Sequence, residues 1–423
     1  MSQEKDTVAS SPKPDSRFAA IWPIVLITAL FFFWGMANNL NDILIPQFKK
    51  AFTLTDLQSG LVQSAFYAGY FFLALPAGFF MRKYGYKAVI ITGLCLFALG
   101  AFLFYPAAEI RQYYLFLGAL FVIASGLAFL ETSANPLMTI LGDEKHAAFR
   151  LNLAQAFNPL GSLVGLWVGQ TFILSGLQTI AEADYVREAK AVQTPYLVIG
   201  AMVLIWALLI AFNKFPKAAT NNTHDSDEAK LSIGQSIGGL LKHKHFLMGV
   251  AAQFFYVGAQ VGIWSYTIRY AQSEIGITDK AAASYVIASL LLFTAGRFIG
   301  TFLMRYMSAT LLLGVFAILN IGLTAYAAGI GGLYGLYALV GCSFFMSIMF
   351  PTIFATSVRG LGPLTKTGAS FLVMSIIGGA ILTVGMGWIS DTSHIRTAII
   401  VPLACFAVVA AYGFSSKTAA RDA

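Results

Sequence analysis

Two acidic residues lie inside long apolar stretches of this 423-residue chain. They are Asp42 and Glu131, and the other 17 of the 19 acidic residues fall in polar segments or at the ends of apolar ones. A carboxylate in the interior of a membrane costs on the order of 2.5–3.5 kcal/mol, so it faces water, a ligand or an opposite charge. Because desolvation favours the protonated form, we predict that Asp42, Glu131 or both carry protons. The alternative is a buried ion pair with Arg297, the one basic residue inside an apolar stretch.

Amide, hydroxyl and indole groups gather in the same stretches. The candidates for ligand contact, besides Glu131, are Trp34, Asn39, Gln155, Asn158, Gln253, Tyr256, Gln260 and Trp264. The last four follow the spacing i, i+3, i+7 and i+11, which places them on one face of a helix. Such side chains offer hydrogen-bond donors, acceptors and flat apolar surfaces, a combination that suits the hydroxyl edges and C–H faces of a sugar. For any single residue, the alternative is an interhelical hydrogen bond, worth roughly 0.6–2 kcal/mol.

The composition indicates what positions these residues, since 58% of the chain is hydrophobic and only 11% is charged. About 20 apolar residues in a helix cross a membrane. Continuously apolar runs such as 201–212 exclude the alternating pattern of a β-barrel. We therefore predict an all-α membrane protein with twelve transmembrane helices. The predicted spans are 18–46, 57–81, 87–107, 113–140, 150–174, 195–213, 246–270, 282–304, 308–328, 333–357, 366–389 and 396–415.

The basic residues orient these spans. With the N-terminus inside, 18 of the 27 Lys and Arg residues would be cytoplasmic and 8 would lie on the other side. This bias predicts that both termini are cytoplasmic. The net charge of +8 is thereby explained by topology, and we expect no nucleic-acid partner. The polar first 17 residues do not resemble a cleavable signal peptide.

The longest polar segment, 214–245, divides the chain into two sets of six spans. The predicted organisation is a cytoplasmic tail (1–17), an N-terminal half (18–213), a cytoplasmic linker (214–245), a C-terminal half (246–416) and a second tail (417–423). A weak repeat supports it. The segments after the second span (78–87) and after the eighth (300–306) both begin with Gly-x-Phe and continue with Met-Arg and then Tyr.

Other chemistry is poorly represented. The five histidines lie in loops or at span ends, the three cysteines are far apart, and no phosphate-binding motif is present. We expect no enzyme activity, no metal site and no cofactor. Gly161, Gly165 and Gly169 have the spacing that lets helices pack closely.

Several segments carry a family resemblance. The segment from Gly78 resembles the loop motif of the major facilitator superfamily, matching at Gly78, Gly85 and Lys87, although Arg82 stands in place of the motif's Asp. Several runs are similar to the fucose–galactose–glucose:proton symporter family of that superfamily, and particularly to its fucose branch: 33–48, 130–136, 149–158, 256–260, 264–266 and 351–354.

The resemblance implies a function. It implies a bacterial inner-membrane protein of the major facilitator fold that imports L-fucose or a related hexose with a proton, driven by the proton gradient, by alternating access. Asp42 and Glu131 fall on the family's functional acids, and Asn39, Gln155 and Asn158 on its sugar-contact positions. Lipid, sugar and proton are then the expected partners of a monomer.

The chain also departs from the fucose pattern. Met349-Phe350 replaces a Gln-Tyr pair, and Pro159 replaces a small polar residue. Glu131 itself favours the fucose branch, because glucose and galactose relatives tend to carry Gln at that position. The alternatives are a glucose/galactose or amino-sugar symporter, an efflux antiporter of other small solutes, and a membrane sensor that transports nothing.

Overall fold

The computed structural model describes residues 14–52, 56–141, 143–173, 189–215 and 231–419. Some side chains within the helices fall outside this description, including those of Asn39 and Asp42. Within the described ranges every regular element is a helix, which confirms the predicted all-α class. The elements before residue 214 are α1 (Pro14–Ala51), α2 (Asp56–Ile110), α3 (Tyr113–Ile140), η1 (Glu144–His146), α4 (Ala147–Gln155), α5 (Phe157–Val168), η2 (Gly169–Ile173) and α7 (Gln193–Phe212).

The second set of elements begins after the polar segment. It comprises α10 (Ile233–Leu240), α11 (Lys244–Ile275), α12 (Asp279–Leu303), α13 (Ala309–Gly329), α14 (Gly332–Met346), α15 (Met349–Val358), η5 (Gly362–Leu364), α16 (Thr365–Met374), η6 (Ser375–Ile377), α17 (Gly378–Thr392), α18 (Ile395–Ala398) and α19 (Ile400–Ala419). The predicted division into halves and linker at 213/214 and 245/246 stays a prediction.

Among the described residues, nine helical stretches are long and apolar enough to cross a membrane. One of them, Ser64–Ile110, has 47 residues; at 1.5 Å per residue it is about twice the thickness of a bilayer core. It breaks at Gly85, whose φ of 79° is one that glycine adopts without steric cost. This break separates the predicted spans 57–81 and 87–107. Ser64–Ile110 thus provides two crossings, and the other eight stretches provide one each. The remaining two of the twelve predicted crossings are α1 and the interrupted pair α4–α5.

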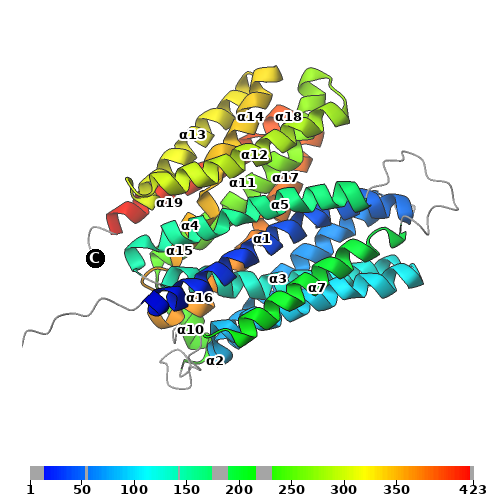
Figure 1. The fold of residues 1–423 in the computed structure, drawn as a ribbon. Coiled ribbons are helices and arrows are strands. Elements are labelled where there is room, and N and C mark those ends of the chain that lie inside the picture. Colours follow the sequence, from blue (N-terminus) through cyan, green and yellow to red (C-terminus); the bar gives the residue numbers. More distant parts are fainter. Residues whose placement is uncertain (1–13, 53–55, 142, 174–188, 216–230, 420–423) are drawn as a thin grey trace, which may run out of the picture.

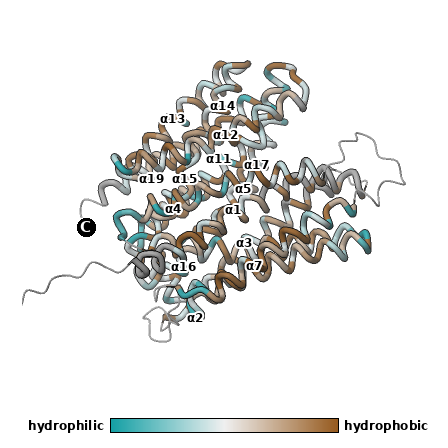
Figure 2. Tube along the Cα trace, in the orientation of Figure 1, coloured by the Kyte–Doolittle hydropathy of each residue, from teal (hydrophilic) through white to brown (hydrophobic). Residues whose placement is uncertain are grey.

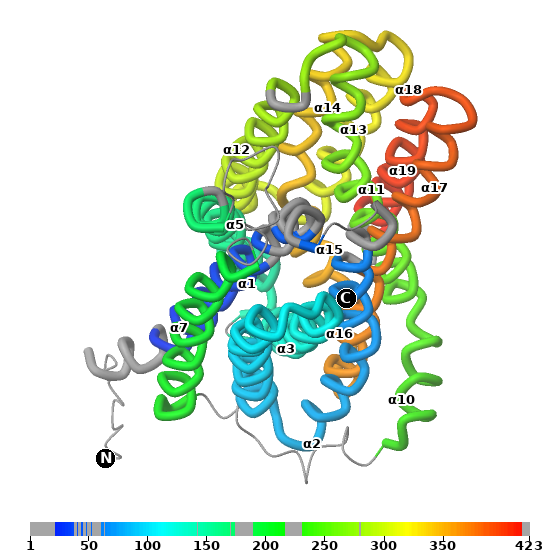
Figure 3. The backbone as a smooth tube through the Cα atoms, turned by 90° about the vertical axis from the view of Figure 1, so that its right-hand side faces the viewer, coloured from blue at the N-terminus to red at the C-terminus, as the bar shows by residue number. Residues whose placement is uncertain are grey.

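The helices form two groups that lie side by side (Figure 1). We assign α1–α5 and α7 to the first group, and α11–α19 with η5 and η6 to the second. The view turned by 90° also shows α12, α13 and α14 apart from α1, α3 and α7 (Figure 3). We call the end of the bundle at which α7 ends and α10 begins the linker end. α1 begins and α19 ends at this same end (Figure 1). Hydrophobic residues follow the helices, whereas hydrophilic ones collect toward their ends (Figure 2).

Apolar packing joins the two groups at the linker end. The largest core cluster combines side chains of the first group with Phe246 of α11, Phe354 of α15 and Leu372 of α16. A separate cluster around Tyr270 and Leu336 packs the second group on its own toward the opposite end. The groups therefore share a hydrophobic core at one end of the molecule.

Small residues let helices approach where the sequence predicts it. A Cβ at Gly161 would overlap the carbonyl oxygen of Phe32, and one at Gly165 would meet the backbone of Met36. The Gly161 and Gly165 spacing therefore packs α5 against α1, as predicted. At the linker end, a Cβ at Gly78 of α2 would overlap the Ser370 hydroxyl of α16. The glycine of the loop motif is thus a contact between the two groups.

Candidate functional site

A cavity of about 460 Å³ lies between the two groups. Its walls come from α1, α2, α3, α4 and α5 on one side and from α11, α12, α15 and η6 on the other. Seven predicted site residues line it: Trp34, Glu131, Gln155, Asn158, Tyr256, Gln260 and Trp264. The cavity is large enough for a monosaccharide and is lined by both polar and aromatic side chains, as small-molecule sites commonly are.

Glu131 supplies the only carboxylate among the described residues that line this cavity. Its side chain is 1% exposed, and neither of its oxygens has a hydrogen-bond partner in the described part of the chain. The same holds for the indole N–H of Trp34 and the hydroxyl of Tyr70, which also line the cavity. Buried polar groups are nearly always paired. These groups have no hydrogen-bond partner among the described residues, so they are suited to the hydroxyl groups of a ligand.

Arg297 takes a place that the sequence reasoning did not assign to it. It is 3% exposed, lines the cavity from α12, and lies over the ring of Phe293 at 4.9 Å. Its Nη1 donates to Gln155, at 3.2 Å to Oε1 and 3.3 Å to the main-chain oxygen. Within the described residues, Arg297 therefore pairs with an amide from the other group and not with Glu131. The alternative of a Glu131–Arg297 ion pair is not what this structure contains.

The amide of Gln155 is held from both sides. While Oε1 accepts from Arg297, Nε2 donates to Oδ1 of Asn135 at 2.9 Å. Asn135 follows Glu131 by four residues on α3, so the two share one helical face. Asn158 lines the cavity half-buried, just beyond the break at Ala156 between α4 and α5. This break lets α4 and α5 both contribute to the same wall.

The α11 stripe is only partly in the cavity. Tyr256, Gln260 and Trp264 line it. Gln253 lies about one turn before Tyr256 on α11, is 0% exposed and is not among the lining residues. The prediction that Gln253 contacts the ligand is therefore not supported by its position. The Tyr256 hydroxyl donates to the Met346 carbonyl at 3.0 Å, so this residue offers the cavity its ring and not its hydroxyl.

Trp264 is likewise fixed by the second group. Its Nε1 donates to the Ser343 hydroxyl at 3.1 Å, and its ring meets that of Phe293 edge to face with centroids 5.1 Å apart. The indole is therefore rigid before any ligand arrives, which reduces the entropy lost on binding. The predicted residues Asn39 and Asp42 lie on α1, but their side chains fall outside the described residues.

The structure adds residues to the candidate site. Besides Arg297, the polar ones are Tyr67, Tyr70, Ser162 and Ser265. Tyr67 and Tyr70 are three residues apart in an apolar stretch, a spacing that would place them on one helical face. The sequence contains 18 Tyr residues, so this signal alone would not have distinguished them from tyrosines that pack in the core.

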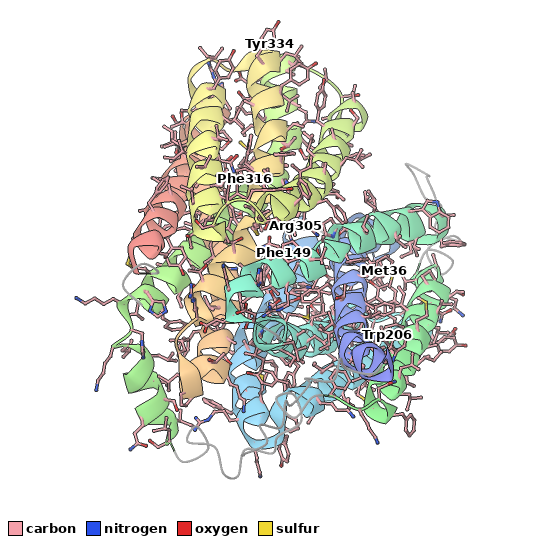
Figure 4. All side chains as sticks on the ribbon, turned by 60° about the vertical axis from the view of Figure 1, so that its left-hand side comes forward. Met36, Phe149, Trp206, Arg305, Phe316 and Tyr334 are labelled. Carbon is pink, nitrogen blue, oxygen red and sulfur yellow. The ribbon has the colours of Figure 1, made fainter. Side chains whose placement is uncertain are left out.

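Polar contacts close the linker end beneath the cavity. Asn152 of α4 donates to Thr352 of α15 at 3.1 Å, and Arg359 pairs with Glu144 at 3.2 Å. Arg305 lies over the ring of Phe149 at 5.5 Å, and Figure 4 shows these two side chains together between the groups. Each contact joins one group to the other on the linker side of the cavity.

Basic residues of the loop motif also make contacts at the linker end. Arg82, which replaces the acidic residue of the motif, donates to the Leu231 carbonyl, and Lys87 donates to the carbonyls of Ala211 and Asn213 at 2.9 Å. These basic side chains bind main-chain oxygens around the ends of α7 and α10. The substitution of the motif's Asp by Arg82 has thus changed an acidic position into one that holds the segment before α10.

Comparisons with known proteins agree with this architecture. The L-fucose-proton symporter of Escherichia coli (strain K12) is 48% identical over 414 residues, covering 94% of each chain. The glucose/galactose transporter of Brucella abortus (strain 2308) is 38% identical over 389 residues, covering 92% of each. A crystal structure of FucP in the outward conformation matches with a TM-score of 0.87 and 47% identity, covering 94% of this chain and 99% of that one.

The family model agrees with these relatives. The model described as Major Facilitator Superfamily matches residues 26–370, which include all the lining residues of the cavity except Ile376. The fold is therefore the twelve-helix fold that the sequence resemblance implied, and the relatives named above are membrane transporters. This chain belongs to the Major Facilitator Superfamily.

Proposed function

We propose that this chain is a proton-coupled sugar symporter that imports L-fucose by alternating access. The observation that carries the proposal is the buried Glu131 carboxyl, which has no partner among the described residues and lines a sugar-sized cavity between the two helical groups. A carboxyl in this position binds a proton from whichever side the cavity opens to. The fucose-proton symporters of E. coli and Haemophilus influenzae, at 48% and 36% identity, support the substrate and the coupling ion.

The polar wall suits the hydroxyl groups of the sugar. Glu131 and Gln155 lie with Trp34 and Tyr70 on the first group's side, where the unpaired atoms of Glu131, Trp34 and Tyr70 can donate to and accept from hydroxyls. Arg297 adds a charged donor from the other side. Asp42 and Asn39, on α1, keep their proposed roles in coupling and sugar contact, respectively. Trp264 and the Tyr256 ring offer flat apolar surfaces to the sugar's C–H face.

The apolar wall favours a 6-deoxy sugar over galactose or glucose. Phe350, Val257, Val261 and Ile376 line the cavity together. Burying a methyl group there gains about 0.8 kcal/mol, whereas burying a hydroxyl without a partner costs about 1–3 kcal/mol. L-Fucose is a 6-deoxy hexose, so its C6 is a methyl group, whereas C6 of galactose or glucose is a hydroxymethyl group. A glucose/galactose symporter, as in the Brucella relative, is the second candidate.

The remaining properties belong to the same proposal. The protein would lie in the bacterial inner membrane as a monomer, with both termini and the segment 214–245 in the cytoplasm. Tails at 1–17 and 417–423 would flank halves at 18–213 and 246–416. The proton gradient would drive transport without a metal, a cofactor or a catalytic residue, and no nucleic acid would bind.

Uptake by proteoliposomes tests this function. The purified protein is reconstituted with an imposed pH gradient, acidic outside, and offered radiolabelled L-fucose, galactose, glucose, mannose or N-acetylglucosamine. We expect accumulation of L-fucose above equilibrium that collapses with a protonophore. Accumulation of galactose or glucose instead would favour the second candidate, and substrate leaving as protons enter would identify an antiporter. No gradient-dependent movement of any sugar would contradict symport.

A further inference from the structure

Pro159 leaves one carbonyl of the cavity wall without its helical donor. In a continuous helix the N–H of residue 159 would donate to the oxygen of Gln155, but proline has no N–H. The helix is in fact interrupted here, since α4 ends at Gln155 and α5 begins at Phe157. A buried carbonyl that loses its partner costs about 1–3 kcal/mol unless another donor replaces it.

The replacement donor comes from the other helical group. Arg297 of α12 donates from one nitrogen, Nη1, to both the main-chain oxygen and the side-chain Oε1 of Gln155. A guanidinium has its donors in a fixed planar fork, so two acceptors on one residue hold it in a defined orientation. The ring of Phe293 supports the guanidinium at 4.9 Å. Both Arg297 and Gln155 are buried.

The same contact fixes the Gln155 amide, which lines the same cavity as Glu131. The Nε2 of Gln155 donates a hydrogen bond to Asn135, and Asn135 lies one turn from Glu131 on α3. Arg297, Gln155 and Asn135 therefore form one hydrogen-bonded chain that crosses from the second group to the first. Arg297 lines the cavity, and its Nε has no hydrogen-bond partner among the described residues.

We propose that Arg297 is a positioning residue whose hold on Gln155 depends on Pro159. It orients the Gln155 amide for the sugar and ties the two groups together while the linker end is closed. The Nε–H remains as a donor for a sugar hydroxyl. The role of Arg297 in sugar binding rests on the proposed sugar transport, whereas its role in joining the two groups does not.

The test compares the loss of Arg297 in two backgrounds. Arg297→Met removes the donors while keeping the length and apolar character of the side chain, and Pro159→Ala restores the N–H. With Pro159 present, R297M should weaken L-fucose binding to the purified protein about tenfold, the effect of one hydrogen bond to a charged group, and should raise KM more than it lowers kcat. In the P159A background, the same substitution should weaken binding only about threefold. Equal losses in both backgrounds would overturn the proposal.

A second readout does not depend on the substrate. Spin labels on cysteines introduced at positions 145 and 242 report the separation of the groups at the linker end, because both lysines are exposed, Lys145 directly before α4 and Lys242 directly before α11. Cys95, Cys342 and Cys405 are first replaced by alanine. R297M should increase the fraction with a separated linker end, and less so in the P159A background. Unchanged distance distributions in R297M would overturn the tie between the groups even if no sugar has been identified.

Two further variants guard against misfolding. Arg297→Lys keeps a charge and an N–H donor and should retain part of the closed fraction; a lysine variant that behaves like R297M would contradict a hydrogen-bonding role. Arg269→Gln changes an arginine on α11 outside the cavity and serves as the matched control. It should leave both the binding and the distance distribution unchanged.

Discussion

The side-chain nitrogen of Asn152 donates to the hydroxyl of Thr352 at 3.1 Å, and this buried bond joins α4 of the first helical group to α15 of the second. The two residues are 200 positions apart in the sequence. Asn152 also donates to the Ala148 carbonyl of its own helix at 2.9 Å. The bond to Thr352 is therefore one that can break without leaving the Asn152 amide nitrogen unpaired, as a transporter that separates its two halves requires.

Thr352→Val should favour separation of the groups at the linker end. The substitution removes the acceptor but keeps the shape of the side chain, and a neutral hydrogen bond contributes about 1 kcal/mol. We expect the closed fraction, measured with the spin labels at positions 145 and 242, to fall by about fivefold relative to the separated one. Thr324→Val is the matched control, because Thr324 is equally buried but its hydroxyl, within the described part of the chain, donates to carbonyls of its own helix, α13. An equal shift in both variants would show that hydroxyl loss acts through general destabilisation.

Glu131→Gln should separate proton coupling from sugar movement. An amide cannot release a proton, so accumulation against a gradient should be lost, whereas exchange of labelled for unlabelled sugar should continue at a measurable rate. Asp42→Asn is tested in parallel, because the sequence assigns coupling to either acid. Glu109→Gln, at an exposed carboxylate bonded to Lys190 and Gln193, should accumulate sugar normally. Full accumulation by both E131Q and D42N would refute the coupling role.

Gly161→Ala should destabilise the packing of α5 against α1. The added Cβ would overlap the Phe32 carbonyl, and overpacking of this kind costs about 1–3 kcal/mol. The thermal unfolding temperature in detergent should fall. Gly118→Ala is the matched control, because nothing lies within 4 Å of a Cβ at that position; alanine there should leave stability unchanged or raise it slightly through helix propensity. A loss of similar size in both variants would contradict close packing at Gly161.

The Glu144–Arg359 pair should contribute weakly to closure of the linker end. Its side chains are 65% and 52% exposed, and exposed ion pairs contribute about 0.2–1 kcal/mol. Glu144→Arg should shift the groups toward separation at low salt, and the charge-swapped double variant E144R/R359E should restore the closed fraction. The shift should shrink at about 1 M salt, where screening is strong. If the double variant does not regain the closed fraction, E144R acts through something other than the loss of this ion pair.

The sequence by itself determined the architecture of the protein and named two candidate acids. A span of about 20 apolar residues is a local property, so composition and spacing predicted the crossings, and the cost of a charge in hydrocarbon singled out Asp42 and Glu131. Residues at regular helical spacing, such as Tyr256, Gln260 and Trp264, could also be placed on one face, because that face is set by the helix alone.

Only the tertiary structure decided what each polar group contacts. In the sequence Arg297 was a candidate partner for an acid, but it binds Gln155, 142 positions away, because Pro159 leaves a carbonyl open at that point of the wall. Helical spacing could not tell that the cavity ends before Gln253, nor that the Tyr256 hydroxyl turns to the Met346 carbonyl. A hydrogen bond depends on atoms brought together from distant segments, and their distances are fixed only when the two groups pack.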